Sequence, residues 1–126
     1  MANTIKVASK VDWLRDSVVD KIGVNKVVEV STTSELCVQT VQTVGTTHEL
    51  IAAGDVTDDA FLWVRNLSST ATVQIGGDSA GSFVEWFFLA PADPEAFLGR
   101  VGALASTYLK ASGASTQIAI RLVKIS

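Results

Sequence analysis

Ala60-Phe-Leu-Trp-Val-Arg-Asn-Leu67 is the stretch that decides the fold, because large apolar side chains occupy both of its faces. Successive side chains of a strand point to opposite sides, so Leu62 and Val64 share one face. The rings of Phe61 and Trp63 fall on the other face. β-branched and aromatic residues favour strands. The stretch therefore predicts a strand that packs one face on a core and carries large rings on the other.

Short runs of the same kind lie on both sides of this stretch, and clusters of Gly, Asn, Asp, Ser and Thr separate them. Such spacing is typical of an all-β sandwich. We expect residues 60–67 and 71–75 to form a hairpin, because the short polar turn Ser68-Ser-Thr70 joins them. The prediction is an antiparallel β-sandwich of seven to nine strands, at residues 26–30, 36–44, 49–52, 60–67, 71–75, 82–89, 96–101, 107–111 and 116–125.

The N-terminal part of the chain is ambiguous. Between residues 11 and 22 the apolar side chains fall at helical spacing, and Asp16, Asp20 and Lys21 take the opposite face. A short helix and a strand-containing arm are both open for this part. Because 126 residues suit one core, we expect a single domain over residues 1–126, with 1–30 as an arm or as a segment that covers the sheet.

The charge and the rare residue types argue against several classes of protein. Ten Lys and Arg against thirteen Asp and Glu give a net charge of −3, which does not suit direct binding of nucleic acid. Cys37 and His48 are the sole residues of their types, so the sequence predicts no disulfide and no Cys/His metal site. We predict no cofactor. No apolar run has the length of a membrane span and no signal peptide is evident, so we expect folding in the cytosol.

Gly77-Asp-Ser-Ala-Gly81 matches the Gly-x-Ser-x-Gly pattern of hydrolases. That motif needs a strand before it, a helix after it and a histidine later in the chain. Here the residues from Phe83 onward predict a strand, and His48 comes earlier. The order of His48, an aspartate and Ser79 matches that of chymotrypsin-like proteases, but their fold needs two barrels. We therefore predict a glycine-rich turn, no catalytic residues and no enzymatic activity.

The chain has more large rings than one sandwich can hide. In residues 82–89, alternation places Phe83 and Phe87 on one face and Trp86 and Phe88 on the other. A two-layer sandwich buries one face of each sheet, so the second set of rings must meet another subunit, the N-terminal segment or a ligand. We favour another subunit. The side chains that we expect at this oligomer or capsid interface are Phe61, Trp63, Trp86 and Phe88.

Rings on a β-sandwich also stack on sugars, so a carbohydrate-binding module is the competing class. Sugar sites combine an aromatic platform with several polar side chains. Near the rings, the sequence offers mainly Arg65 and Glu85. Contact with protein therefore fits better, and a carbohydrate-binding or host-adhesion module of a head or tail fibre is the alternative.

Six pieces of sequence follow one another from residue 39 to the C-terminus. They are Gln42-Thr-Val-Gly-Thr-Thr47, Ala53-Gly-Asp-Val-Thr57, Phe61-Leu-Trp-Val-Arg-Asn-Leu67, Val73-Gln-Ile-Gly-Gly-Asp-Ser-Ala-Gly81, Phe87-Phe-Leu-Ala-Pro91 and the closing residues 118–125. In this order they resemble small bacteriophage virion structural proteins, which share a jelly-roll-like sandwich.

The resemblance implies a jelly-roll-like fold and a non-enzymatic part of a phage particle. It implies a capsid decoration (cement) protein, made in the host cytoplasm and assembled into the virion. The expected partners are further copies of the chain and the major capsid protein or another virion protein. A homotrimer is favoured over a dimer. Many weak, symmetric contacts would then stabilise the shell through avidity.

Overall fold

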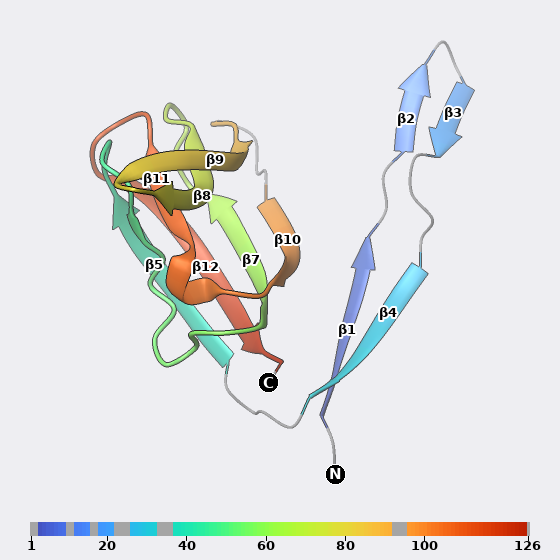
Figure 1. Ribbon diagram of the computed structural model, residues 1–126. Helices are drawn as coiled ribbons and strands as arrows, with labels where there is room; N and C mark the ends of the chain where they lie inside the picture. Colours follow the sequence, from blue (N-terminus) through green and yellow to red (C-terminus); the bar gives the residue numbers. More distant parts are fainter. Residues whose placement is uncertain are drawn as a thin grey trace. The chain divides into compact units, whose positions relative to one another are not determined.

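A computed structural model of the chain describes residues 3–9, 12–15, 18–21, 26–32, 37–91 and 96–125. The chain divides into two compact units, residues 1–33 and residues 34–126. Figure 1 shows both units as strands, and the described residues contain no α-helix.

The second unit is a sandwich of two four-stranded antiparallel sheets. One sheet, the β12 sheet, has the order β10-β7-β12-β5, and the other, the β8 sheet, has the order β6-β11-β8-β9. A 3₁₀ turn, Leu104–Ser106, lies between β10 and β11. The strands are β5 (Cys37–Val44), β6 (Glu49–Leu50), β7 (Ala60–Asn66), β8 (Val73–Ser79), β9 (Ser82–Leu89), β10 (Ala96–Val101), β11 (Tyr108–Ala111) and β12 (Thr116–Lys124).

This order of strands is that of an eight-stranded jelly roll. Every connection crosses from one sheet to the other, except the one between β8 and β9. Two Greek keys wound in this way give the double-sheet jelly roll. The prediction of an all-β, antiparallel, jelly-roll-like sandwich of seven to nine strands is therefore confirmed for this unit (Figure 1).

The predicted hairpin between residues 60–67 and 71–75 is wrong. β7 pairs with β10 and β12, whereas β8 pairs with β9 and β11. The buried side chain of Asn66 accounts for the crossing. Its Nδ2 donates hydrogen bonds to the carbonyl oxygens of Ala71, Leu89 and Ala90, at 2.8, 3.2 and 3.2 Å. Because these acceptors border the β8 sheet, the side chain holds the end of β7 against the opposite layer.

The core lies between the two sheets and follows the alternation of the sequence. In β7 and β12, every second residue points inward, as predicted, and Leu62, Ile118, Ile120 and Leu122 are completely buried. The β8 sheet contributes buried side chains from β8 and β11, among them Ile75 and Leu109. The fully buried large residues of the core are Leu62, Ile75, Leu104, Leu109, Ile118, Ile120, Leu122, Val44, Val56, Val64, Val73 and Thr107.

The hairpin that does form joins β8 to β9 through a two-residue turn. Ala80 and Gly81 have φ angles of 53° and 88°, as a type I′ turn requires. The carboxylate of Asp78 accepts a hydrogen bond from the N–H of Gly81 at 2.8 Å. The predicted strand at 71–75 therefore continues to Ser79, because the glycine-rich stretch is extended rather than a loose turn.

In the first unit the described strands form two antiparallel pairs, which we call the N-terminal ribbon. β1 (Asn3–Ser9) pairs with β4 (Lys26–Thr32), and β2 (Asp12–Arg15) pairs with β3 (Val18–Lys21). Of the two alternatives for residues 11–22, the described part is therefore the strand-containing arm and not the helix.

Candidate functional site

The open side of the sandwich, where β9 and β10 are the edge strands of their sheets, carries an apolar groove. Phe87 of β9 stacks on Phe97 of β10, with ring centroids 4.0 Å apart and a tilt of 29°. Both rings also pack on the core. The stack therefore ties the two sheets together where no strand closes the gap.

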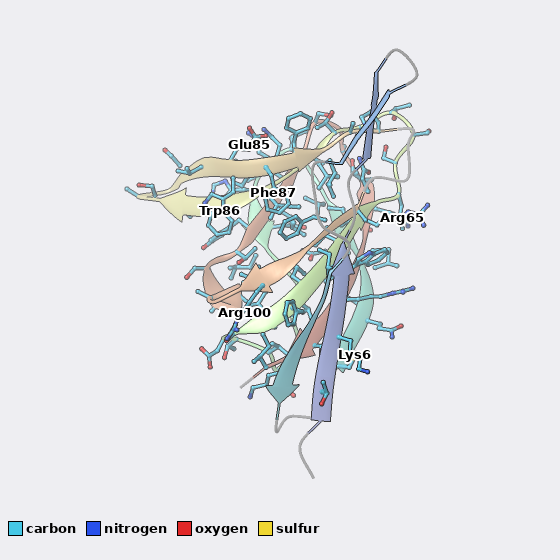
Figure 2. The ribbon with its side chains drawn as sticks, turned by 90° about the vertical axis from the view of Figure 1, so that its right-hand side faces the viewer. Lys6, Arg65, Glu85, Trp86, Phe87 and Arg100 are labelled. Carbon is cyan, nitrogen blue, oxygen red and sulfur yellow. The ribbon has the colours of Figure 1, made fainter. Side chains whose placement is uncertain are left out.

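The groove has a volume of about 500 Å³. Figure 2 shows Trp86 and Phe87 together on the β8–β9 hairpin, which extends beyond the rest of the sandwich. Trp86 is 52% exposed. The residues that line the groove are Trp86, Phe87, Phe97, Arg100, Val101, Gly102, Ala103 and Ser106.

A β-bulge brings the Trp86 ring into this groove. Ile75 pairs with Phe87 and Gly76 pairs with Glu85, so Trp86 is an extra residue in β9. A Cβ on Gly76 would lie 1.9 Å from the carbonyl oxygen of Val84, so only glycine allows the close approach of the strands. The bulge changes which side chains share a face in the outer half of β9.

The predicted alternation of residues 82–89 is therefore wrong in its first half. A Cβ on Gly77 would lie 3.1 Å from the Trp86 ring, and Trp86 lines the same groove as Phe87. Phe83 lies instead on the outer surface of the β8 sheet, where Lys110 Nζ is 5.8 Å from its ring centroid. An extra residue reverses the alternation of all residues beyond it.

A paired arginine forms the polar rim of the groove. The Nε of Arg100 donates a 2.9 Å hydrogen bond to Oδ1 of Asp59, and Nη2 donates a second bond to Oδ2. These hydrogen bonds, and the attraction of the guanidinium, lower the pKa of Asp59 and raise that of Arg100. The pair fixes the end of edge strand β10 to the loop that precedes β7.

The outer face of the β12 sheet combines rings with arginines. In register, Trp63 of β7 lies opposite Leu98 of β10 and Arg121 of β12. The guanidinium of Arg121 lies 4.8 Å from the Trp63 ring centroid, a cation–π distance. Arg65, two residues along β7, adds a second positive charge, and its Nε is buried without a hydrogen-bond partner. We call this surface the arginine face.

The outer face of the β8 sheet holds a histidine–carboxylate pair. Nε2 of His48 lies 2.7 Å from Oδ2 of Asp78. The hydrogen bonds from His48 and from the Gly81 N–H lower the pKa of Asp78. The His48 ring also contacts Phe83 and Tyr108, with centroids 5.6 and 5.3 Å away. The pair connects the β5–β6 loop to the β8–β9 hairpin.

The four side chains predicted for an interface lie on three different surfaces. Phe61 and Trp63 are half-buried neighbours on the arginine face. Trp86 lies in the groove, and Phe88, 60% exposed, lies on the outer face of the β8 sheet. The structure therefore brings together only Phe61 and Trp63. Sequence reasoning missed Phe97, because no local pattern reveals that β10 lies beside β9.

The hydrolase-like motif is the β8–β9 hairpin. Ser79 pairs with Ser82 across the turn, and a strand follows, not a helix. Within the described ranges, no three His, Cys, Asp or Glu side chains are grouped to hold a metal ion. No helix among the described residues is long and apolar enough to cross a membrane.

Comparisons with known proteins give no match. No family model, no curated protein and no solved structure matches this chain. Inference about function therefore depends on the groove and the two sheet faces.

Proposed function

We propose that this chain is a non-enzymatic structural protein of a bacteriophage virion, of the capsid decoration (cement) type, and that it works as a homo-oligomer. The observation that carries the proposal is the groove at the β9–β10 side, which leaves the Trp86 ring 52% exposed. Exposed large rings in a preformed hollow are typical of the anchor positions of protein interfaces. We assign this groove to contact with the shell.

The fold is consistent with the proposal but does not by itself select this function. Double-sheet jelly rolls occur in viral capsid proteins and in lectins, so the strand order is compatible with more than one function. What separates these functions is the chemistry of the exposed surfaces. Around Trp86 that chemistry is largely apolar, with Phe87, Phe97 and Val101 beside it.

The N-terminal ribbon adds support of a different kind. Its register pairs β1 with β4 over residues 3–9 and 26–32, and β2 with β3 over residues 12–15 and 18–21. A ribbon of two strands is marginally stable in water by itself. Such a segment suits a protein that works packed against other surfaces in an assembly.

The mechanism that follows is avidity. One groove of this size buries too little surface for tight binding. Many copies arranged symmetrically on a shell engage together, so the assembly gains stability that a single contact does not provide.

Mass spectrometry of gradient-purified particles tests the proposal. Particles from host cells that carry the encoding phage genome should contain the chain at a fixed ratio to the major shell protein. Trp86→Ala should reduce that ratio at least about tenfold, because a buried ring at an interface contributes 2 kcal/mol or more, by the usual order of magnitude. Leu67→Ala is the matched control, since Leu67 is exposed but outside the groove. A chain that is expressed but missing from the particles would refute the proposal.

A carbohydrate-binding or host-adhesion module is the second candidate, and the same groove favours it. Arg100 and Ser106 place polar groups beside the rings, as sugar sites require. On a glycan array this candidate predicts a signal that Trp86→Ala removes and Leu67→Ala keeps. An array without signal would exclude the carbohydrate-binding module. If the chain is also present in particles, the decoration protein is the candidate that stands.

A further inference from the structure

We propose that the arginine face of one copy binds the aspartate loop of a second copy. The aspartate loop is the turn between β6 and β7 that carries Asp55 and Asp58. The inference deepens the proposed function and rests on its homo-oligomeric part. It names the two surfaces that meet, and the occupant of the arginine face is another molecule of the same chain.

The arginine face has positive charge that nothing on the same face neutralises. The outward positions of its four strands hold arginines from β7, β10 and β12 and no acidic residue. Arg100 pairs with Asp59 at the border. Arg65 and Arg121 have no carboxylate partner among the described residues, and the buried Nε of Arg65 lacks any acceptor.

The same face also offers apolar area to a partner. Leu98, 46% exposed, lies opposite the half-buried Trp63, and Val41, 56% exposed, lies opposite Ala119 on the far side of β12. Stacking on Trp63 holds the guanidinium of Arg121 in place, so little side-chain freedom is lost when an acid binds it. Preorganised charge beside apolar surface is typical of protein–protein contacts.

The aspartate loop is anchored by backbone hydrogen bonds and by a buried side chain, and the carboxylates of Asp55 and Asp58 have no partner among the described residues. Val56 is buried, and its N–H donates a 3.1 Å hydrogen bond to the carbonyl of Ala53. The carbonyl of Thr57 accepts a 3.0 Å bond from the N–H of Ala105. Asp55 and Asp58 are exposed on either side of this anchor, and no hydrogen bond or ion pair holds either carboxylate among the described residues.

The distance between the two arginines is compatible with the distance between the two aspartates. Arg65 lies opposite Ala119, so Arg65 and Arg121 are diagonal neighbours on adjacent strands, at about 7–8 Å. Asp55 and Asp58 are three residues apart and can be separated by no more than about 11 Å. Asp59 of the same loop pairs with Arg100 at the border of the face, whereas Asp55 and Asp58 pair with no arginine among the described residues of their own chain. The charges of these two aspartates are therefore available to a second copy.

Reciprocal charge reversal tests the inference in the full-length protein. Sedimentation velocity at low ionic strength should show an oligomer for the wild type. Arg65→Glu with Arg121→Glu, and separately Asp55→Lys with Asp58→Lys, should each weaken self-association at least about tenfold, because like charges then meet. Mixing the two variants should restore it, since each supplies the surface that complements the other. Raising the salt concentration should weaken the wild-type oligomer.

A matched control separates this contact from an effect of net charge. Glu49→Lys with Glu85→Lys changes the net charge as the aspartate variant does, at exposed positions outside the loop. It should leave the oligomer intact. Circular dichroism and thermal melting establish that each variant is folded.

Three outcomes would overturn the inference: a monomeric wild type at low salt, an oligomer that survives both reversals, or variants that fail to associate when mixed. If the chain is found in purified particles, the decoration role stands under all three outcomes, and a monomeric wild type removes only the homo-oligomeric part of the proposed function. Conversely, mixing that restores the oligomer while particles lack the chain would support the contact and refute the decoration role.

Discussion

The two open sides of the sandwich are bridged by different chemistry. Where β5 meets β6, the Gln42 amide bridges the gap. Its Nε2 donates to the Leu50 carbonyl at 3.0 Å and to Oε1 of Glu49 at 3.3 Å, and its oxygen accepts from the Ala52 N–H at 2.7 Å. Where β9 meets β10, the stack of Phe87 on Phe97 bridges it.

The two sides differ in how much apolar surface they leave exposed to a partner. The Gln42 amide has its donors and acceptor satisfied within the chain, so this side gains little from a partner. The aromatic side leaves a groove with Trp86 half exposed, and its apolar area is buried only when another molecule covers it. The polar side closes the sandwich, whereas the aromatic side closes it and leaves an apolar groove exposed.

Phe97→Ala should give the largest effect on stability. The substitution removes the ring that ties β10 to β9, and we expect a loss of about 3 kcal/mol, the lower end of the range for a buried phenylalanine. Urea unfolding followed by tryptophan fluorescence measures it. Leu98→Ala is the control, because Leu98 is the next residue of the same strand and is exposed on the other face. Equal losses in the two variants would contradict the role of the stack.

Gln42→Ala should lower the free energy of unfolding by about 1 kcal/mol, an intermediate loss. The loss is modest because water can replace the hydrogen bonds that a partly exposed amide makes. The same urea experiment measures it. Gln39→Ala, at an exposed position of the same strand, should be near neutral. If Gln42→Ala lowers the free energy of unfolding as much as Phe97→Ala does, the hydrogen bonds of one open side contribute as much stability as the aromatic stack of the other. That result would contradict the difference between the two sides.

The smallest effect concerns pH and the Arg100–Asp59 pair beside the groove. The hydrogen bonds from Arg100 lower the pKa of Asp59 in the folded protein. Its contribution to stability is therefore complete above the ordinary carboxyl pKa of about 4 and is lost as the pH falls through the lower folded value. Asp59→Asn should have a lower free energy of unfolding than the wild type at pH 7. The difference between the two proteins should disappear by about pH 2. A gap that is constant with pH would contradict this.

Much of the sandwich could be predicted from alternation. The inward positions of β7 and β12 follow from side chains whose period matches that of a strand. The predicted bounds 82–89 and 96–101 also match β9 and β10, although the bulge breaks the predicted alternation of β9. The interface set of Phe61, Trp63, Trp86 and Phe88 stays a prediction. The structure spreads these rings over three surfaces, which local alternation does not reveal.

What the sequence by itself determined is the class of fold and most strand positions, because the alternation of Leu62, Trp63 and Val64 is a property of neighbouring residues. Only the tertiary structure decided that β7 and β8 belong to different sheets and that the Trp86 ring lies beside Phe97. Strand partners are chosen by contacts between residues far apart in the chain, such as Asn66 with Leu89. The bulge at Gly76 likewise depends on how closely β8 and β9 approach each other. This distance cannot be predicted from the sequence of either strand alone.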